Sequence, residues 1–126
     1  MVRLNGKDGS PDPVFGSTGA KVVALGSGNV DLVNALAIQG GGFVIAGGTV
    51  NGGANTDSFV ARIGDDTLLD PRFAGGFVPH EFSDSVDAID QLQGIAVDTS
   101  GRIVATGFYV SGPSNLEKVI VARFWP

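Results

Sequence analysis

The sequence predicts an all-β fold of short antiparallel strands. Three observations lead to this prediction: abundant glycine, β-forming runs between the glycines, and an internal repeat. Glycine accounts for 20 of the 126 residues, about twice its usual share of roughly 7%. The glycines separate runs rich in Val, Ile, Ala and Phe. Such an alternation of strand-forming and turn-forming residues is typical of many short strands joined by tight turns.

The internal repeat is the most informative of these observations. Asn34–Ile38 recurs as Gln93–Val97, and Gly42–Ala46 recurs as Gly101–Ala105 at the same offset. Other pairs, matched at nearly the same offset, are Asp12–Phe15 with Asp70–Phe73, Asp31 with Asp90, Gly48 with Gly107, Val60–Ile63 with Val121–Phe124 and, as a third partial copy, Val2–Leu4 with Ala61–Ile63. A constant period, here about 59 residues, is the signature of a repeat architecture.

The repeat divides a single all-β domain, residues 1–126, into repeat 1 (about 5–63) and repeat 2 (about 64–126). Each repeat is expected to supply four strands, at Lys21–Leu25, Leu32–Gln39, Phe43–Val50 and Ser58–Ile63 in repeat 1 and at Phe77–Phe82, Leu92–Asp98, Arg102–Val110 and Val119–Phe124 in repeat 2. Gln39–Gly42 and Asp98–Gly101 are predicted hairpin turns, since glycine adopts positive φ freely. The fold class is therefore two tandem four-stranded antiparallel β-propeller-like blades; a compact sandwich of the same strands is the alternative.

One window competes with the strand prediction. Ser85–Gln93 has Val86, Ile89 and Leu92 at a spacing of three residues, with Gly94 behind them as a C-cap. This pattern also fits a short helical turn.

The repeated residues resemble a known family. The residues that carry the pattern are Asp8-Gly9-Ser10, Asp12, Phe15-Gly16, Ala35, Ala37, Gln39, Gly42, Ala46-Gly47 and Ala61-Arg62 in the first copy, and Asp70, Phe73, Gly75, Ala96, Gly101–Ala105, Gly107 and Ala122-Arg123 in the second. This pattern resembles the delta-60 repeat family of β-propeller-like bacterial proteins. The resemblance implies modules of large surface or secreted proteins, and so an extracellular or cell-surface setting for a parent protein, but it implies no conserved chemistry.

Two blades cannot close a propeller, so the pattern also predicts assembly. If the strand at Lys21–Leu25 is the outermost of its blade, the last blade, Leu92–Phe124, lacks such a strand and the N-terminal copy is spare. A spare strand can complete the last blade of the next subunit, which gives a head-to-tail ring. We expect a homo-oligomer, a trimer with six blades or a tetramer with eight. The alternative is that the chain is an excised piece of a longer repeat protein.

Charge and composition exclude several classes of partner. The net charge is −5, and the eight Lys and Arg residues do not cluster, which argues against nucleic acid. The sequence has no run of about 18 apolar residues and so no predicted membrane span. No signal peptide is visible in residues 1–10, and the absence of cysteine leaves the compartment open.

Acidic residues form two candidate sites, each with a plainer interpretation. His80 and Glu81 lie near Asp84, Asp87 and Asp90, a set that could ligate a cation or perform acid–base chemistry. A solvated acidic edge is the favoured interpretation, because neighbouring strand residues point to opposite faces. The second site, Asp8, Ser10 and Asp12, resembles the start of a calcium loop, but turn capping by the carboxylates fits better.

The repeated charged and aromatic positions are expected to be structural. They are Asp12, Phe15, Asp31, Arg62, Asp70, Phe73, Asp90 and Arg123. Arg62 and Arg123 occupy equivalent positions, which predicts an ion pair with Asp31 or Asp90, or with Asp12 or Asp70; a ligand-binding arginine in each blade is the alternative.

The function predicted from the sequence is a non-enzymatic structural or interaction module that self-assembles into a ring. The alternative is a ring-forming, lectin-like binder of carbohydrate or another small ligand, with Tyr109, Trp125 and His80 as ligand candidates. No catalytic, metal-binding or cofactor-binding residues are predicted. The glycine runs at 40–42 and 47–48 lack the Lys-Ser/Thr that a phosphate-binding loop requires.

Overall fold

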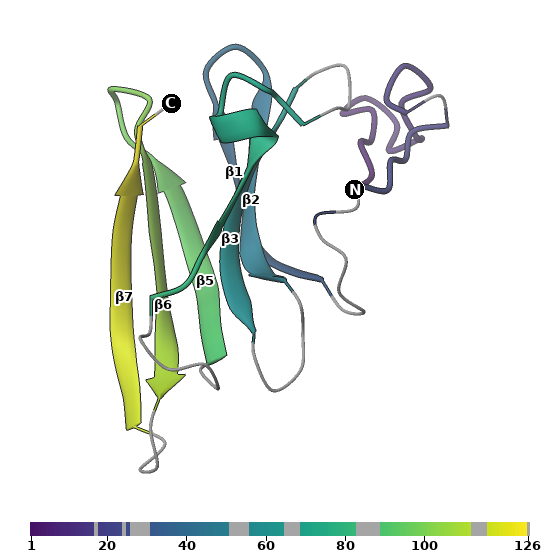
Figure 1. The fold of residues 1–126 in the computed structure, drawn as a ribbon. Coiled ribbons are helices and arrows are strands. Elements are labelled where there is room, and N and C mark those ends of the chain that lie inside the picture. The colour runs from purple at the N-terminus through teal and green to yellow at the C-terminus, as the bar shows by residue number, and fades with distance from the viewer. Residues whose placement is uncertain are drawn as a thin grey trace.

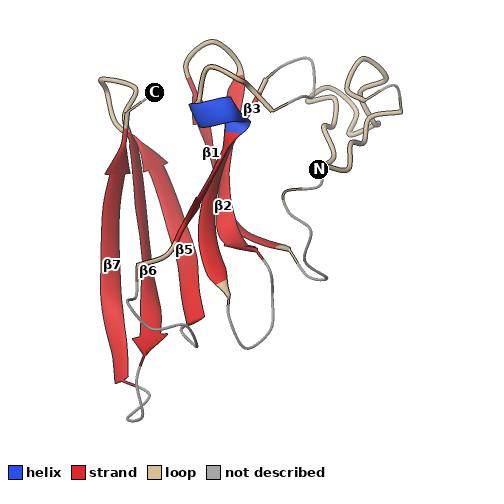
Figure 2. Ribbon diagram, in the orientation of Figure 1, coloured by secondary structure: helices blue, strands red, loops and turns tan. Residues whose placement is uncertain are grey.

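The chain folds into two antiparallel sheets that pack against each other (Figures 1 and 2). The computed structural model describes residues 1–16, 18–23, 25, 31–50, 56–64, 69–82, 89–111 and 116–125. The first sheet has the order β1 (Leu32–Gln39), β2 (Phe43–Val50), β3 (Asp57–Ile63) and β4 (Phe77–His80), and the second has β5 (Ile89–Val97), β6 (Ile103–Ser111) and β7 (Leu116–Phe124). The one helix among the described residues is a 3-10 turn at Ala74–Gly76. The all-β prediction is confirmed.

The two predicted hairpin turns are present. Gln39 pairs with Phe43 across the first turn, where Gly41 and Gly42 have φ values of 86° and 84°. In the second turn Gly101 has a φ of 80° and donates its N–H to the Asp98 carbonyl at 2.9 Å. Positive φ at these positions is strained for any residue with a Cβ, so glycine fixes both turns and with them the register of the hairpins.

The fourth strand differs from the sequence prediction. Phe77–Phe82 was expected to open the second blade, but β4 pairs with β3 of the first sheet, with Ala61 opposite Phe77 and Ser58 opposite His80. The chain returns along β3 because Leu69 bridges Ile63 and the Asp70 N–H donates to the Arg62 carbonyl at 2.8 Å. The second sheet therefore has three strands and not the predicted four.

The N-terminal segment has an arrangement equivalent to that of β3 and β4, but with fewer paired residues. Ala20 bridges Val2, and the Lys21 N–H donates to the Met1 carbonyl at 2.8 Å. The described residues of the predicted strand Lys21–Leu25 thus lie beside the start of the chain and outside both sheets. They follow the residue that bridges Val2, in the same antiparallel sense in which β4 pairs with β3.

The hydrophobic core lies on the two faces of the first sheet. The cluster between the sheets contains Ile45 and Val60 from the first sheet and Leu92, Ile103 and Ile120 from the second. The cluster on the opposite face is formed by Ala46, Val50, Phe59, Ala61 and Ile63, with Met1, Leu25, Val44, Leu69 and Phe77 packed against it. The outer face of the first sheet is therefore covered over β2 and β3 but not over β1, where Val33, Leu36 and Ile38 are exposed. The second sheet is covered on the face toward the first.

Hydrogen bonds among the described residues also join the sheets. The Asn34 amide donates to the Leu92 carbonyl at 2.9 Å, and the Gln39 amide donates to the Gly101 carbonyl at 2.6 Å. The Asp90 N–H donates to the Thr56 carbonyl at 2.7 Å. These directional bonds, added to the apolar contacts, fix how one sheet is set on the other.

The helical alternative for Ser85–Gln93 is wrong where it can be compared with the structure. Ile89–Gln93 belong to β5, and 85–88 lie outside the described residues. In the ranges given above, no helix is long and apolar enough to cross a membrane.

Candidate functional site

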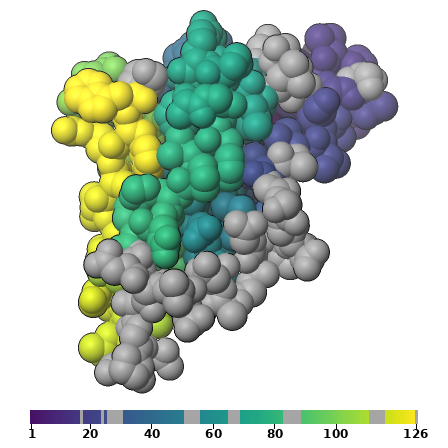
Figure 3. Space-filling model, in the orientation of Figure 1, coloured from purple at the N-terminus to yellow at the C-terminus, as the bar shows by residue number. Residues whose placement is uncertain are grey.

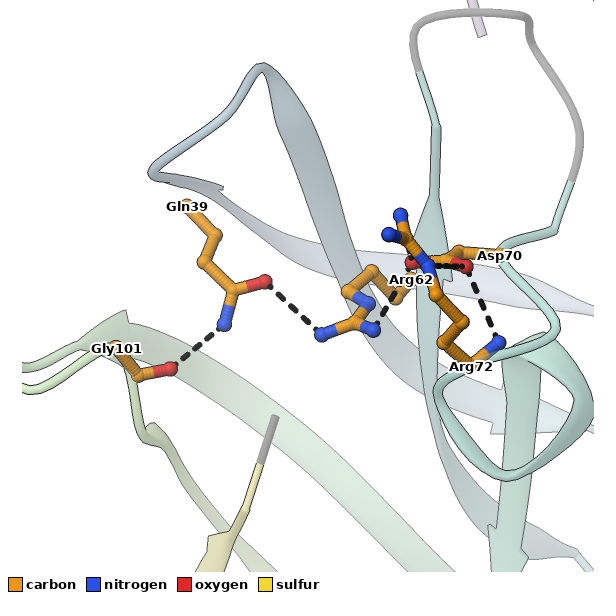
Figure 4. Close-up of polar contacts among 5 residues, drawn as sticks. All are labelled: Gln39, Arg62, Asp70, Arg72 and Gly101. Carbon is orange, nitrogen blue, oxygen red and sulfur yellow. Dashed lines mark hydrogen bonds and ion pairs between the residues drawn. The ribbon is translucent and has the colours of Figure 1, made fainter.

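The polar centre of the first sheet is Arg62 on β3 (Figure 4). Its side chain is 8% exposed, and its Nη2 lies 2.9 Å from Asp70 Oδ2. Its Nη1 donates to Gln39 Oε1 at 3.5 Å. The guanidinium carbon lies 5.0 Å from the ring centroid of Phe43 and 5.3 Å from that of Phe73. A buried arginine held by one carboxylate, one amide and two aromatic rings is an organising group for the turn after β3.

Asp70 also forms an ion pair with a second arginine, Arg72. The Arg72 backbone N–H and Nε both donate to Asp70 Oδ1, at 3.1 and 2.9 Å. The hydrogen bond from the Arg72 side chain, with the charge of Arg62 adding to it, holds the pKa of the Asp70 carboxyl below its ordinary value of 3.8 against the opposing effect of burial. The pKa of Arg72 is raised by the same hydrogen bond. Asp70 is therefore ionised at neutral pH and closes the turn.

The same cluster occurs at the N-terminus. Arg3 Nε lies 2.8 Å from Asp12 Oδ2, and its guanidinium carbon lies 4.9 Å from the Phe15 ring centroid. The Asp12 N–H donates to the Arg3 carbonyl, and Asp12 Oδ1 accepts from the Val14 N–H. The cluster Arg3–Asp12–Phe15 thus reproduces Arg62–Asp70–Phe73. Sequence reasoning did not select Arg3, although the match of Val2–Leu4 to Ala61–Ile63 was the signal for it.

The third arginine of the series, Arg123 on β7, has a different environment. It is exposed, and among the described residues no carboxylate lies within ion-pair distance of it. Its guanidinium carbon lies 5.8 Å from the ring centroid of Trp125, which Arg102 also approaches at 5.5 Å. The predicted ion pair is therefore present for Arg62, with Asp70 from the four proposed aspartates, and not for Arg123.

The His80 group is only partly described. His80 is exposed and its ring lies edge-on to Phe82, with the centroids 4.3 Å apart. Asp90 is buried and accepts the Phe82 N–H at 2.6 Å, while 84 and 87 lie outside the described residues. Within the described chain no group of three or more His, Asp or Glu side chains is placed to hold a metal ion.

The other predicted positions are surface features. Asp8 Oδ1 accepts from the Ser10 N–H at 3.0 Å and from its hydroxyl at 2.7 Å, as turn capping requires. These two bonds, the backbone one first, hold the pKa of Asp8 below its ordinary value. Asp31 is exposed. Trp125 is 69% exposed, and Lys118 Nζ lies 5.2 Å from the Tyr109 ring centroid.

Two cavities in the described part of the chain border the first sheet. One of about 230 Å³ lies beside Phe43, Asp70 and Arg72. A second, of about 400 Å³, lies between the N-terminal segment and the first sheet, with Met1 and Leu25 on one side and Val33 and Leu36 on the other. The larger cavity is apolar and is roofed by the short N-terminal segment.

Comparison with known proteins adds no relative: no protein-family model, curated protein or solved structure matches this chain. The resemblance to delta-60 repeats stays a prediction from the sequence pattern.

Proposed function

We propose that this chain is a non-enzymatic interaction module whose sheets act as propeller-like blades and which assembles with copies of itself, head to tail, into a ring. The observation that carries the proposal is the pattern of exposed apolar residues at the two ends of the two-sheet stack. These residues are the repeat counterparts of those that pack the sheets together inside the chain.

The first end of the stack is the outer face of β1. Its side chains Val33, Leu36 and Ile38 are 54%, 57% and 73% exposed. Their counterparts in the second copy of the repeat are Leu92, Ile95 and Val97 on β5, which pack into the cluster between the sheets. The outer face of β1 therefore carries the same kind of apolar surface that β5 uses to pack against the first sheet.

The other end of the stack is the outer face of β7. Val121 is 72% exposed and Val119 is 82% exposed. Val60, the counterpart of Val121, is fully buried against the second sheet. The outer face of β7 therefore carries the same kind of apolar surface that β3 uses to pack against the second sheet.

The outer face of β1 in one copy could therefore pack on the outer face of β7 in another, as β5 packs on β3 within the chain. A contact of this kind is heterologous, and it closes into a ring when the rotation between successive sheets divides a full turn. Contiguous apolar residues at such a face favour an interface over a free surface. Three copies would supply six sheets and four copies would supply eight.

The test is the mass in solution, measured by light scattering on a sizing column over a range of dilutions. The proposal requires a species of about three or four times 12.8 kDa at the higher concentrations, which dissociates to the monomer only on extensive dilution. Val121→Glu is expected to convert it to a monomer, whereas Thr99→Glu, which adds the same charge at an exposed site in the β5–β6 turn, is expected to leave the mass unchanged. A wild-type monomer at every concentration contradicts the proposal.

A second candidate is carbohydrate binding. The exposed ring of Trp125 favours it because aromatic faces stack on sugars, whereas Tyr109 lies opposite Lys118 toward the other end of the β6–β7 hairpin. A glycan array with and without calcium tests this candidate, and loss of any signal in Trp125→Ala would assign the signal to that ring.

A further inference from the structure

We propose that the second sheet receives its fourth strand from residues 20–23 of a second copy, and that Asp12 of that copy then pairs with Arg123 in place of its own Arg3. The proposal rests on the self-assembly proposed above and names the segment that makes the contact. It is argued from the three versions of one cluster within this chain.

The first version is complete and serves as the template. After β3, the Arg62–Asp70 ion pair closes the turn, Phe73 packs on the guanidinium, and β4 then pairs with β3. The side chains of this ion pair are 8% and 3% exposed. An arginine at the end of a strand, a turn with Asp and Phe, and an added strand thus form one unit.

The second version, on β7, has the arginine alone. Arg123 stands at the repeat position of Arg62, but among the described residues no carboxylate lies within ion-pair distance of it. The edge of β7 that corresponds to the β4 side of β3 has no neighbouring strand in the described chain. Unpaired backbone N–H and C=O groups on such an edge are a template for another strand.

The third version, at the N-terminus, has the turn and the added strand but only a short stretch of strand to receive them. Val2 and Leu4 make single bridges, to Ala20 and Pro11. The Arg3 and Asp12 side chains are 36% and 23% exposed, compared with the nearly buried Arg62–Asp70 pair. Because exposed ion pairs contribute less to stability than buried ones, the Arg3–Asp12 pair is the weaker of the two. Arg123 and the end of β7 would have to replace the backbone bonds that residues 1–4 make to Gly19 and Lys21.

The register of the exchange follows from the template. In the first sheet Ala61 lies opposite Phe77 and Val60 opposite Val78, and at the N-terminus Val2 lies opposite Ala20. Transferred to β7, this register sets Ala122 opposite Ala20 of the second copy and Val121 opposite its Lys21. Val22, which is 91% exposed in the single chain, then lies opposite Ile120.

The two partners of this exchange cannot meet within one chain. The N-terminal segment and β7 lie at opposite ends of the molecule, with the first sheet and β5 between them (Figures 1 and 3). The exchange therefore links different copies. In each link, residues 1–4 are displaced by the end of β7 from the neighbouring copy.

The experiment uses disulfide formation between two single-cysteine variants, because the wild-type chain has no cysteine. The Lys21→Cys and Val121→Cys variants are mixed, oxidised and analysed by mass spectrometry. The mass of the wild-type chain is measured by light scattering under the same conditions. The expected product is a mixed disulfide that contains one copy of each variant, at least tenfold above the yield from Lys7→Cys mixed with Val121→Cys. An oligomer without the mixed disulfide overturns this inference and leaves the proposed function standing, whereas a monomer overturns both.

A second measurement follows the arginine. Arg123→Ala is expected to weaken self-association by about tenfold, since a charge-assisted hydrogen bond to Asp12 is lost at the interface. Arg72→Ala is the matched control, because Arg72 serves Asp70 within its own chain, and it is expected to leave association unchanged. Equal effects of the two substitutions would overturn the assignment of Arg123.

Discussion

The two sheets are copies of one sequence pattern in different surroundings. The first sheet has four strands, packs an apolar cluster on each face and buries its arginine beside Asp70. The second has three strands, and its arginine is exposed. Their difference teaches that burial of a repeat position is decided by its neighbours along the stack and not by the residue itself. Equivalent residues in the two sheets should therefore respond differently to the same substitution.

The largest difference is expected at the arginines. Arg62→Ala removes a buried ion pair and should lower the free energy of unfolding by about 3 kcal/mol. Arg123→Ala, at an exposed position, should change it by less than about 0.5 kcal/mol. Urea unfolding of both variants, at a concentration where the wild type is monomeric, gives the comparison. Similar losses would mean that Arg123 is buried in the single chain after all.

The valine pair gives a smaller difference of the same kind. Val60→Ala should cost about 2 kcal/mol, because Val60 is fully buried between the sheets and both transfer and cavity terms apply. Val121→Ala should cost less than about 0.5 kcal/mol in the monomer. In the assembled state the cost at Val121 should rise, since the proposed interface buries it. Unfolding measured at low and high protein concentration separates the two cases, and a cost at Val121 that does not depend on concentration would contradict the interface.

The bulge glycines should show no difference between the sheets. A Cβ on Gly48 would overlap the Leu32 carbonyl, and a Cβ on Gly107 would overlap the Gln91 carbonyl, each beside the bulge of its hairpin. Because the obstacle is backbone, Gly48→Ala and Gly107→Ala should each cost about 1 to 2 kcal/mol. Thermal unfolding of the two variants tests this, and a loss at one glycine only would show that the hairpins are not equivalent.

The smallest effect concerns acid. Asp70 binds its proton more weakly in the folded chain, since hydrogen bonding by Arg72 lowers its pKa below 3.8. Its contribution to stability is therefore complete above this ordinary value and is lost as the pH falls through the lowered pKa. Unfolding followed from about pH 5 to about pH 2 should show a shallower loss for Asp70→Asn than for the wild type. Parallel curves would mean that Asp70 does not contribute.

The sequence predicted the hairpins well and the strand partners less well. The turns at Gln39–Gly42 and Asp98–Gly101 depend on local glycine chemistry, and both are where the pattern placed them. The partner of Phe77–His80 depends on where the chain goes after Asp70, and a repeat reveals its period but not which strands share a sheet. The sequence therefore assigned that strand to the wrong sheet.

The polar cluster was also predicted only in part. Repetition marked Arg62 as structural but left four aspartates as partners, because the choice depends on a turn that brings Asp70 back to β3. The Gln39 bond to Gly101 could not be found by repetition, since Asp98 stands at the equivalent position in the second copy. A contact between the sheets joins one residue from each copy, and these two residues do not occupy equivalent repeat positions. Comparing the copies therefore does not reveal such a contact.

The pairing of β4 with the preceding sheet has a consequence for how such a chain can lengthen in evolution. The first sheet takes its outer strand from the beginning of the next repeat. A tandem duplication of one whole repeat therefore supplies a fourth strand to each earlier sheet, wherever the breakpoints fall. An added repeat would therefore meet a strand edge of the kind it pairs with at each of its two ends.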